Sequence, residues 1–373
     1  MNIGLLGFGV VGRGVYDITK TRNDIAVTKV VCLEDVTLPD AKVTKDFRDI
    51  LEDPSIDTVV EAMGGVHPAY EFVRSAMEAG KNIVTSNKAL VATYYTELVS
   101  LAQEKGLKFR CTAAVGGGIG WLTSLENSRR VQKLRRVGGI MNGTCNYILD
   151  SMTRLGLGYA DALKQAQALG YAEANPSTDV DGIDTWHKLL LSANVAFGIR
   201  LEPSTVPAAG IRNITAGDVK QFNEHGYVCK LLSRAVMEEG CCSAMVQPTL
   251  LARTTLEAAV PSNYNLITYD GEYSGIQSYY GQGAGRYPTA YNVVLDCVDV
   301  LKGVGFYTDL GTPVTAENTA PMRYYIRSAD PLPWQAEENW GDGVLTVPVS
   351  PTQVHSWLRE HPDAFIAALA QEN

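Results

Sequence analysis

Residues Ile3-Gly4-Leu5-Leu6-Gly7-Phe8-Gly9-Val10-Val11-Gly12 decide the fold of the amino-terminal third of the chain. A short apolar run leads into Gly-x-Gly-x-x-Gly, and an amphipathic helix through Val15 and Ile18 follows. In such a strand–loop–helix, the glycines permit a tight turn, close approach of a pyrophosphate and close packing of helix on strand. The helix N-terminus also offers unpaired N–H groups to phosphate. We therefore predict that Gly7, Phe8, Gly9, Val10, Val11 and Gly12 bind a dinucleotide; a glycine-rich turn without a ligand is the alternative.

Strand and helix patterns alternate over the first third of the chain, which is typical of a parallel sheet. Strands are predicted at 3–6, 27–33, 58–61, 82–85 and 107–111, and helices at 68–79 and 89–105. From about residue 130 the rhythm changes. A strand is predicted at 136–141, helices at 146–154, 160–169, 183–197 and 290–302, and strand-like alternation between 240 and 280. The last fifty residues are predicted to be an irregular segment with one helix near 351–370.

Glu34 lies 22 residues after Gly12, at the end of the predicted second strand. A carboxylate at this position accepts hydrogen bonds from the adenosine ribose hydroxyls and repels a 2′-phosphate. The nearest upstream arginine is Arg22, in a predicted loop. The pattern therefore favours NAD over NADP, and a solvated loop acid is the alternative for Glu34.

The composition is that of an ordinary globular protein, with 46% hydrophobic and 20% charged residues among 373, enough for two or three domains. The net charge of −9 disfavours a nucleic-acid partner. No apolar run reaches the ~18 residues of a membrane span, and Met1-Asn2-Ile3-Gly4 does not resemble a signal peptide. We therefore expect a cytoplasmic protein that acts on small molecules and binds neither nucleic acid nor membrane.

The seven cysteines are scattered and show no zinc spacing. We predict buried free thiols. A further role is left open for Cys145, because it lies within a polar motif.

Four further segments carry residues that a packed core would not select. They are Thr85-Ser86-Asn87-Lys88 at a strand end, the glycine-rich Val115-Gly116-Gly117-Gly118-Ile119-Gly120, Asn142-Gly143-Thr144-Cys145-Asn146 before a helix, and Gly170-Tyr171-Ala172-Glu173-Ala174-Asn175-Pro176. Polar residues at the carboxyl ends of parallel strands are typical of a ligand site.

Asp184 and Lys188 are four residues apart on a predicted helix with an apolar surround, so they share one face. Burial lowers the pKa of a lysine and a nearby carboxylate raises it, which suits a group that moves a proton to or from an alkoxide. An ordinary surface ion pair is the alternative.

Taken together and in order, these motifs resemble the homoserine dehydrogenase family from residue 1 to about 325. The resemblance is carried by 7–12, 61–65, 84–88, 142–149, 170–173, 179–188 and Gly281-Gln282-Gly283-Ala284-Gly285-Arg286-Tyr287-Pro288-Thr289-Ala290. It implies interconversion of L-homoserine and L-aspartate 4-semialdehyde with a nicotinamide cofactor, in the biosynthesis of threonine and methionine.

The resemblance also implies residue roles. Lys188 would be the acid/base for the hydroxyl proton, and Lys88 a second cation near the reacting oxygen. Glu173 and Asp184 would bind the substrate ammonium, while Asn142, Gly143 and Thr144 frame substrate and cofactor. The cofactor would further contact Gly64, Thr85, Ser86, Asn87, Lys88 and Gly285.

The resemblance implies an α/β fold with a Rossmann domain at 1–130, to which 281–320 returns. An α+β substrate-binding and dimerisation domain would cover 131–280, and a short extension 321–373. We expect a homodimer or homotetramer. The 46 residues after Arg327 are too few for the regulatory ACT domain of many relatives, so no ACT domain is expected.

Three positions depart from the family pattern. Gly120 replaces a proline, so we expect a looser loop, and Asn175 replaces an aspartate beside the implied ammonium site. Relatives often bind sodium through backbone carbonyls, here those of Val115, Gly117 and Ile119, and an upstream glutamate. Thr112 stands at the glutamate position, and this loss of charge disfavours the cation. A dehydrogenase of another small amino alcohol or aldehyde, or a non-catalytic nucleotide-binding relative, therefore remains an alternative.

Overall fold

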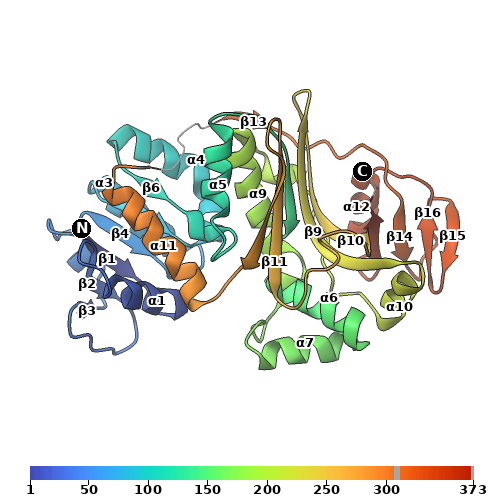
Figure 1. Cartoon of the computed structure of the whole chain (residues 1–373), viewed down its shortest axis with the longest axis horizontal. Coiled ribbons are helices and arrows are strands. Elements are labelled where there is room, and N and C mark those ends of the chain that lie inside the picture. The colour runs from blue at the N-terminus through green and yellow to red at the C-terminus, as the bar shows by residue number, and fades with distance from the viewer. Residues whose placement is uncertain (306–310, 371–373) are drawn as a thin grey trace. The chain divides into compact units, whose positions relative to one another are not determined.

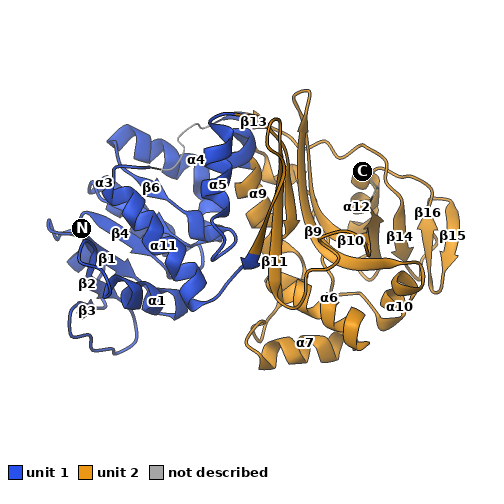
Figure 2. Ribbon diagram, in the orientation of Figure 1, with its two compact units in different colours: residues 1–131, 194–200, 281–312 blue, residues 132–193, 201–280, 313–373 orange. Residues whose placement is uncertain are grey.

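The computed structural model describes residues 1–305 and 311–370 and divides into two compact units (Figures 1 and 2). Unit 1 comprises 1–131, 194–200 and 281–312, and unit 2 comprises 132–193, 201–280 and 313–373. Residues 306–310 and 371–373, which belong to the expected regions 281–320 and 321–373, lie outside the described residues.

Unit 1 is built on a six-stranded sheet in which neighbouring strands run parallel. Its order is β3-β2-β1-β4-β5-β6. The strands are β1 Asn2–Leu6, β2 Ala26–Val31, β3 Lys42–Thr44, β4 Thr58–Glu61, β5 Asn82–Thr85 and β6 Phe109–Arg110. This is the classic strand order of a Rossmann fold, whose ligands bind at the carboxyl ends of the strands. The predicted α/β class is confirmed.

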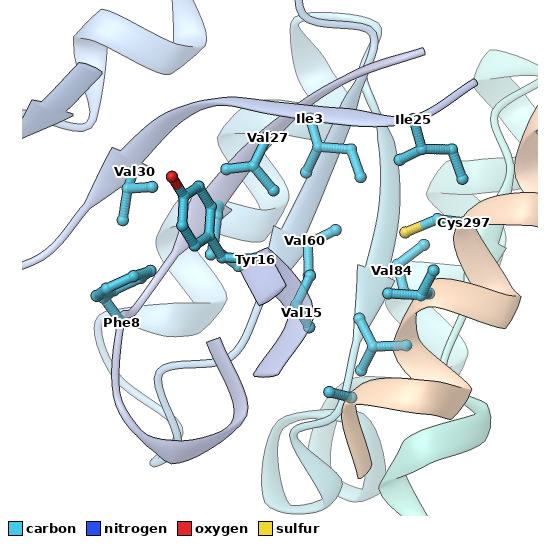
Figure 3. Close-up of a cluster of buried hydrophobic side chains, with 14 of the residues drawn as sticks. Ile3, Phe8, Val15, Tyr16, Ile25, Val27, Val30, Val60, Val84 and Cys297 are labelled. Carbon is cyan, nitrogen blue, oxygen red and sulfur yellow. The ribbon is translucent and has the colours of Figure 1, made fainter. Parts of the chain in front are cut away.

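Helices cover this sheet. They are α1 Val10–Thr19, α2 Arg48–Leu51, α3 Ala69–Glu78, α4 Lys88–Lys105, α5 Trp121–Arg129 and α11 Arg286–Leu301, with the 3₁₀ turn η1 Thr112–Ala114. Figure 3 shows a buried cluster in which Val15 and Tyr16 of α1 and Cys297 of α11 meet strand residues such as Val60. A Cβ on Gly14 would lie 2.8 Å from the Cβ of Ala290, so α1 and α11 pack closely. The helix after residue 285 is thus part of the core of unit 1.

Unit 2 is built on a mixed nine-stranded sheet of order β12-β11-β7-β9-β10-β17-β14-β16-β15. The strands are β7 Leu134–Ile140, β9 Tyr227–Glu238, β10 Cys241–Ala252, β11 Tyr264–Gly271, β12 Gly275–Gln282, β14 Tyr324–Arg327, β15 Ala336–Trp340, β16 Gly343–Thr346 and β17 Phe365–Leu369. The helices are α6 Gly143–Leu155, α7 Tyr159–Ala168, α8 Ser177–Val180, α9 Ile183–Phe197, α10 Ala216–Glu224, α12 Pro351–Glu360 and the 3₁₀ turn η2 Pro203–Thr205. The last residues of α9 belong to unit 1. Strands β8 Ile199–Leu201 and β13 Thr312–Val314 form a separate pair.

The carboxyl-terminal segment is not irregular, and that prediction was wrong. It adds β14, β15, β16 and β17 to the sheet of unit 2, and the helix ends at Glu360. Strand β17 pairs in parallel with Thr249 and Leu250 of β10 and antiparallel with β14. The Asp218 carboxylate of α10 accepts hydrogen bonds from Tyr325 Oη at 2.6 Å and Arg327 Nε at 2.9 Å. These contacts make the segment an integral part of unit 2.

The sequence-based predictions on the cysteines and on a membrane span can be compared with the structure. All seven cysteines are unpaired, but Cys241 is exposed, so the prediction that all are buried was wrong for this residue. Across the described ranges, no helix combines the length and apolarity needed to cross a bilayer.

Candidate functional site

The glycine loop between β1 and α1 has the geometry of a phosphate cradle. Gly7 has φ +90°, and a Cβ on it would lie 2.8 Å from the carbonyl oxygen of Ala62. A Cβ on Gly12 would lie 2.1 Å from the carbonyl oxygen of Gly7, so helix and loop touch through backbone. Above Gly9, by contrast, a Cβ would meet nothing within 4 Å. The first turn of α1 therefore opens onto free space, where its N–H groups can meet phosphate.

Glu34 follows β2, and its carboxylate forms an ion pair with Arg13 at 2.8 Å. The side chains are 69% and 39% exposed, so the pair is open to a ligand. The Arg13 guanidinium also lies 4.8 Å from the ring centroid of Phe8. The role of Arg13 was not predicted from the sequence, because Arg13 and Glu34 are 21 residues apart and meet only when β2 lies beside α1. A cation at this position is suited to a phosphate as well as to Glu34.

Glu61 is a buried carboxylate that organises the ends of β4 and β5. It accepts hydrogen bonds from the backbone N–H groups of Met63 and Gly64 and from Thr85 Oγ1, the last at 2.5 Å. Asn87 Nδ2 lies 3.4 Å from its Oε1. Burial raises the pKa of Glu61, while these donors act in the opposite direction. In the sequence, Glu61 stands out only as part of a motif, and nothing in the local pattern predicts this role.

The segment 85–88 is partly committed to this internal network. Thr85 is fully buried, and Asn87 caps α4 by accepting from the N–H of Leu90 and donates to the Gly65 carbonyl. Ser86 and Lys88 are half-buried, and Lys88 is the first residue of α4. Of the predicted cofactor contacts here, Ser86 and Lys88 therefore expose more of their side chains than Thr85 and Asn87.

Two predicted cofactor glycines stand at sharp turns of unit 1. Gly64 has φ +81°, and a Cβ there would meet nothing within 4 Å, so the loop after β4 leaves its backbone accessible. Gly285 has φ +129° and is the N-cap of α11, which places another helix N-terminus in this unit.

In unit 2, Lys188 and Asp184 form a buried ion pair on α9. Lys188 Nζ lies 2.7 Å from Asp184 Oδ2 and donates to the Met141 carbonyl, also at 2.7 Å. The residues are only 8% and 4% exposed. The alternative of a surface ion pair is therefore wrong. A buried ammonium held by one carboxylate and one carbonyl is fixed in place and suited to donating to a substrate oxygen.

Asn142 connects this pair to the start of α6. Its Oδ1 caps the helix by accepting from the N–H of Cys145, while its Nδ2 donates to Asp179 at 2.7 Å and to Asp184 at 2.8 Å. Asp184 Oδ2 thus accepts from both Asn142 and Lys188. The predicted residues Asn142, Asp184 and Lys188 are brought together.

The two residues after Asn142 hold the same corner of unit 2. Thr144 Oγ1 donates to the carbonyl of Tyr171 at 2.5 Å, which ties α6 to the segment before Glu173. A Cβ on Gly143 would lie 2.6 Å from the Asn263 carbonyl oxygen, so the chain requires glycine there.

Glu173 is exposed, and among the described residues no hydrogen bond or ion pair joins its carboxylate to Asp184 or Lys188. Its backbone is fixed, because Gln167 Nε2 donates to its carbonyl. Asn175 Oδ1 accepts from the N–H and hydroxyl of Ser177 at the start of α8. An aspartate could make the same contacts, so the departure at 175 changes the charge without removing this turn.

Cys145 is a structural thiol. It is fully buried, and its Sγ donates to the Asp179 carbonyl at 3.2 Å. Burial, and secondarily the carboxylates of Asp179 and Asp184, raise the pKa of this thiol well above its ordinary value. A nucleophilic thiolate is therefore disfavoured.

The loop 115–120 ends at Gly120, which is the N-cap of α5. The Gly120 carbonyl accepts from both the N–H and the hydroxyl of Ser124 at the start of α5.

Thr112, just before this loop, donates from its hydroxyl to Asp296 Oδ1 at 2.7 Å and from its N–H to Oδ2 at 2.8 Å. Within the described part of the chain, no group of three or more His, Cys, Asp or Glu residues could hold a metal ion.

Two family models together match most of the chain. One, described as homoserine dehydrogenase, matches residues 121–298, and the other, described as homoserine dehydrogenase NAD binding domain, matches residues 7–112. The homoserine dehydrogenase of Bacillus subtilis is 36% identical over 318 residues, which cover 82% of this chain and 73% of that protein. The Pseudomonas aeruginosa enzyme is 37% identical over 316 residues, which cover 82% and 73%.

Solved structures agree. A homoserine dehydrogenase from Thiobacillus denitrificans matches with a TM-score of 0.86 at 31% identity, covering 100% of this chain and 98% of that one. The Staphylococcus aureus enzyme matches with a TM-score of 0.79 at 26% identity, covering 100% and 99%.

Proposed function

The chain belongs to the homoserine dehydrogenase family, and from this premise we propose how its residues divide the reaction. The enzyme is an oxidoreductase with an NAD(P)-binding domain, and it interconverts L-homoserine and L-aspartate 4-semialdehyde. The observation that carries the proposal is the buried Lys188–Asp184 pair, whose ammonium is held by two acceptors at 2.7 Å.

Lys188 is the acid/base. Reduction of the aldehyde adds a hydride to the carbonyl carbon and a proton to its oxygen, and a bound nicotinamide supplies the hydride. Lys188 Nζ already donates to Asp184 and Met141, its two acceptors among the described residues. The third N–H of the ammonium can therefore face the substrate oxygen. Donation stabilises the alkoxide as it forms, and transfer of the proton completes the alcohol.

Asp184 has two tasks in this proposal. Its carboxylate keeps Lys188 charged and oriented, and with Glu173 it supplies negative charge for the substrate ammonium. Asn142 supports it by donating to Oδ2 at 2.8 Å. Gly143 and Thr144 shape the neighbouring backbone, and the family resemblance assigns Lys88 as a second cation for the reaction. The exposed side chain of Glu173 leaves it free to turn toward a ligand.

For the cofactor, the residues of unit 1 fit a dinucleotide. The open space above Gly9 at the N-terminus of α1 admits a pyrophosphate, and Gly7, Phe8, Val10, Val11, Gly12, Gly64 and Gly285 frame it. Glu34 binds the ribose hydroxyls and gives a preference for NAD. Arg13 moderates that preference, because it can leave Glu34 and pair with a 2′-phosphate, so NADP is used more weakly rather than rejected.

We further propose a homodimer or homotetramer working in the cytoplasm. The domain roles follow the units, with unit 1 binding the cofactor and unit 2 the substrate. Sedimentation analysis of the purified chain tests the assembly: a monomer at assay concentrations would rule it out.

The test of substrate is a panel followed by NAD(P)H absorbance. Homoserine and aspartate 4-semialdehyde should react with at least one cofactor. Serine, threonine and 5-hydroxynorvaline, which carry the hydroxyl one carbon nearer to or farther from the amino acid centre, should have kcat/KM values lower by at least about tenfold, since each misplaces the hydroxyl relative to Lys188. A panel in which another amino alcohol outperforms homoserine would refute the assignment and point to the charge change at Asn175.

A further inference from the structure

One buried side chain bridges two carbonyls of the glycine-rich loop in unit 1. Asn292, on α11, donates from Nδ2 to the carbonyl oxygen of Gly117 at 2.5 Å and to that of Ile119 at 3.2 Å. Asn292 is fully buried. Gly117 and Ile119 are two of the three positions whose carbonyls the family resemblance implies as sodium ligands, although the threonine at position 112 disfavours the ion.

The orientation of the Asn292 amide follows from its partners. Carbonyl oxygens only accept hydrogen bonds, so the NH₂ end must face them and its two N–H groups are used, one for each carbonyl. Its Oδ1 is buried and, among the described residues, has no hydrogen-bond partner. Asn292 Oδ1 is therefore left unpaired while the carbonyl oxygens of Gly117 and Ile119 both receive a hydrogen bond. This arrangement indicates that the bridge stabilises the loop.

The loop 115–120 is packed too closely to rearrange around an ion. A Cβ on Gly117 would lie 2.6 Å from the Gly283 carbonyl oxygen, and a Cβ on Gly118 would lie 2.7 Å from the Cβ of Pro288. The N–H of Gly118 also donates to the Gln282 carbonyl at 3.2 Å. The loop is thus clamped against the segment that leads into α11, the helix that carries Asn292.

The residues present do not fit a cation. A sodium or similar ion needs several oxygen ligands and a compensating negative charge. The hydroxyl and N–H of Thr112 are both directed to Asp296. The Asp296 carboxylate in turn pairs with the buried guanidinium of Arg110 at 3.1 Å, and Glu126 and Asp299 pair with the same guanidinium. The carboxylate beside Thr112 is therefore already committed to a built-in cation, and the two carbonyls already share a donor.

We propose that the Asn292 amide occupies the place of a monovalent cation, making this enzyme independent of sodium and potassium. Asn292 is then a positioning residue, which fixes the loop 115–120 by hydrogen bonds that do not depend on the salt. A cation could bind both carbonyls only by displacing the amide or by turning it so that Oδ1 became a ligand. The bridge lies within unit 1, and its test requires no turnover.

The test compares wild type with Asn292→Asp and Asn292→Ala in sodium chloride and in choline chloride at equal ionic strength. Wild type should melt within about 1 °C in the two salts. Both variants should melt roughly 5 °C lower in choline chloride, because two buried carbonyls lose their donor. In Asn292→Asp the new carboxylate faces these carbonyls, so sodium should restore at least about half of the loss.

A matched control is Asn265→Asp, because Asn265 is equally buried but lies on β11 of unit 2. Its loss of stability should be the same in both salts. Direct binding is followed by ²³Na NMR: wild type should give no saturable broadening, and Asn292→Asp should give it. If Asn292→Asp does not fold, the wild-type spectrum and the melting of Asn292→Ala still decide.

Saturable ²³Na broadening in wild type, or a wild-type melting temperature that rises in sodium chloride relative to choline chloride, would overturn the proposal. So would an Asn292→Ala variant as stable as wild type in choline chloride. Failure of homoserine oxidation would leave all three measurements unaffected, so the two proposals fail independently.

Discussion

Replacing Glu34 by glutamine should shift the cofactor preference from NAD toward NADP. The substitution keeps the size of the side chain and removes its charge. It also breaks the ion pair with Arg13, at 2.8 Å, and leaves this guanidinium next to the position of a 2′-phosphate.

The magnitude has three parts. Loss of a charged acceptor for the ribose hydroxyls costs about 1 kcal/mol of NAD binding, since hydrogen bonds to ions are roughly twice as strong as neutral ones. Removing the repulsion between a carboxylate and a phosphate favours NADP by about 1 kcal/mol at this exposed, screened site. Arg13 adds about 1 kcal/mol once it pairs with the phosphate. The sum of about 3 kcal/mol predicts a change of roughly 100-fold in the ratio of kcat/KM for the two cofactors.

The assay is homoserine oxidation followed by absorbance at saturating substrate with each cofactor. Asp35→Asn is the matched control, because this neighbouring acid pairs with Lys45 at 2.8 Å rather than with Arg13. It should leave the ratio almost unchanged. Adding Arg13→Ala to Glu34→Gln should lower the kcat/KM ratio of NADP to NAD roughly fivefold relative to Glu34→Gln alone. Equal effects of Glu34→Gln and Asp35→Asn, or a ratio that Glu34→Gln changes by less than about twofold, would refute the reasoning.

Three further predictions concern the residues that hold each unit. Glu61→Ala removes the acceptor of the backbone N–H groups of Met63 and Gly64. The free energy of unfolding, measured by urea titration, should therefore fall by about 3 kcal/mol, and the KM for NAD, measured by steady-state kinetics, should rise. Asp218→Asn weakens the contacts to Tyr325 and Arg327, so stability should fall by about 3 kcal/mol and limited proteolysis should cut the carboxyl-terminal segment faster than in wild type. Burial lowers the pKa of His355 in the folded protein to about 4, below the pKa of about 6.5 of an unfolded histidine. As the pH falls, the unfolded state therefore takes up a proton first. The stability that neutral His355 contributes is complete above the unfolded pKa and is lost as the pH falls toward 4. Between about pH 7 and about pH 4.5, His355→Gln should lose roughly 2 kcal/mol less stability than wild type; an identical pH dependence would contradict the pKa.

Local patterns were sufficient for most of unit 1. The glycine loop, Glu34 and the strand ends at 61 and 85 follow from spacing and alternation, because a parallel sheet repeats the same strand–helix rhythm. The pairing of Arg13 with Glu34 could not be found in this way. It depends on how β2 lies beside α1, and no local pattern specifies the distance between two exposed side chains.

The carboxyl-terminal segment shows the opposite case. Phe365-Ile366-Ala367-Ala368-Leu369 favours a helix by composition, yet it forms β17. Pairing with β10 and β14 and complete burial of this run outweigh the local preference. For the site, the four-residue spacing predicted that Asp184 and Lys188 share a face, but their burial and the additional contacts to Asn142 and Met141 depend on long-range packing.

The most direct test of the central claim is kcat for homoserine oxidation by Lys188→Met beside Lys230→Met. Both lysines are buried in unit 2, but Lys230 donates to Asn146 and the Val260 carbonyl, away from Asp184. Loss of a general acid/base should lower kcat by about 10²- to 10⁴-fold in Lys188→Met, with the KM for NAD changed by less than about threefold. Lys230→Met should lower the melting temperature and keep kcat within about threefold of wild type. A Lys188→Met enzyme that retains kcat, or equal losses of kcat in the two variants, would contradict the account.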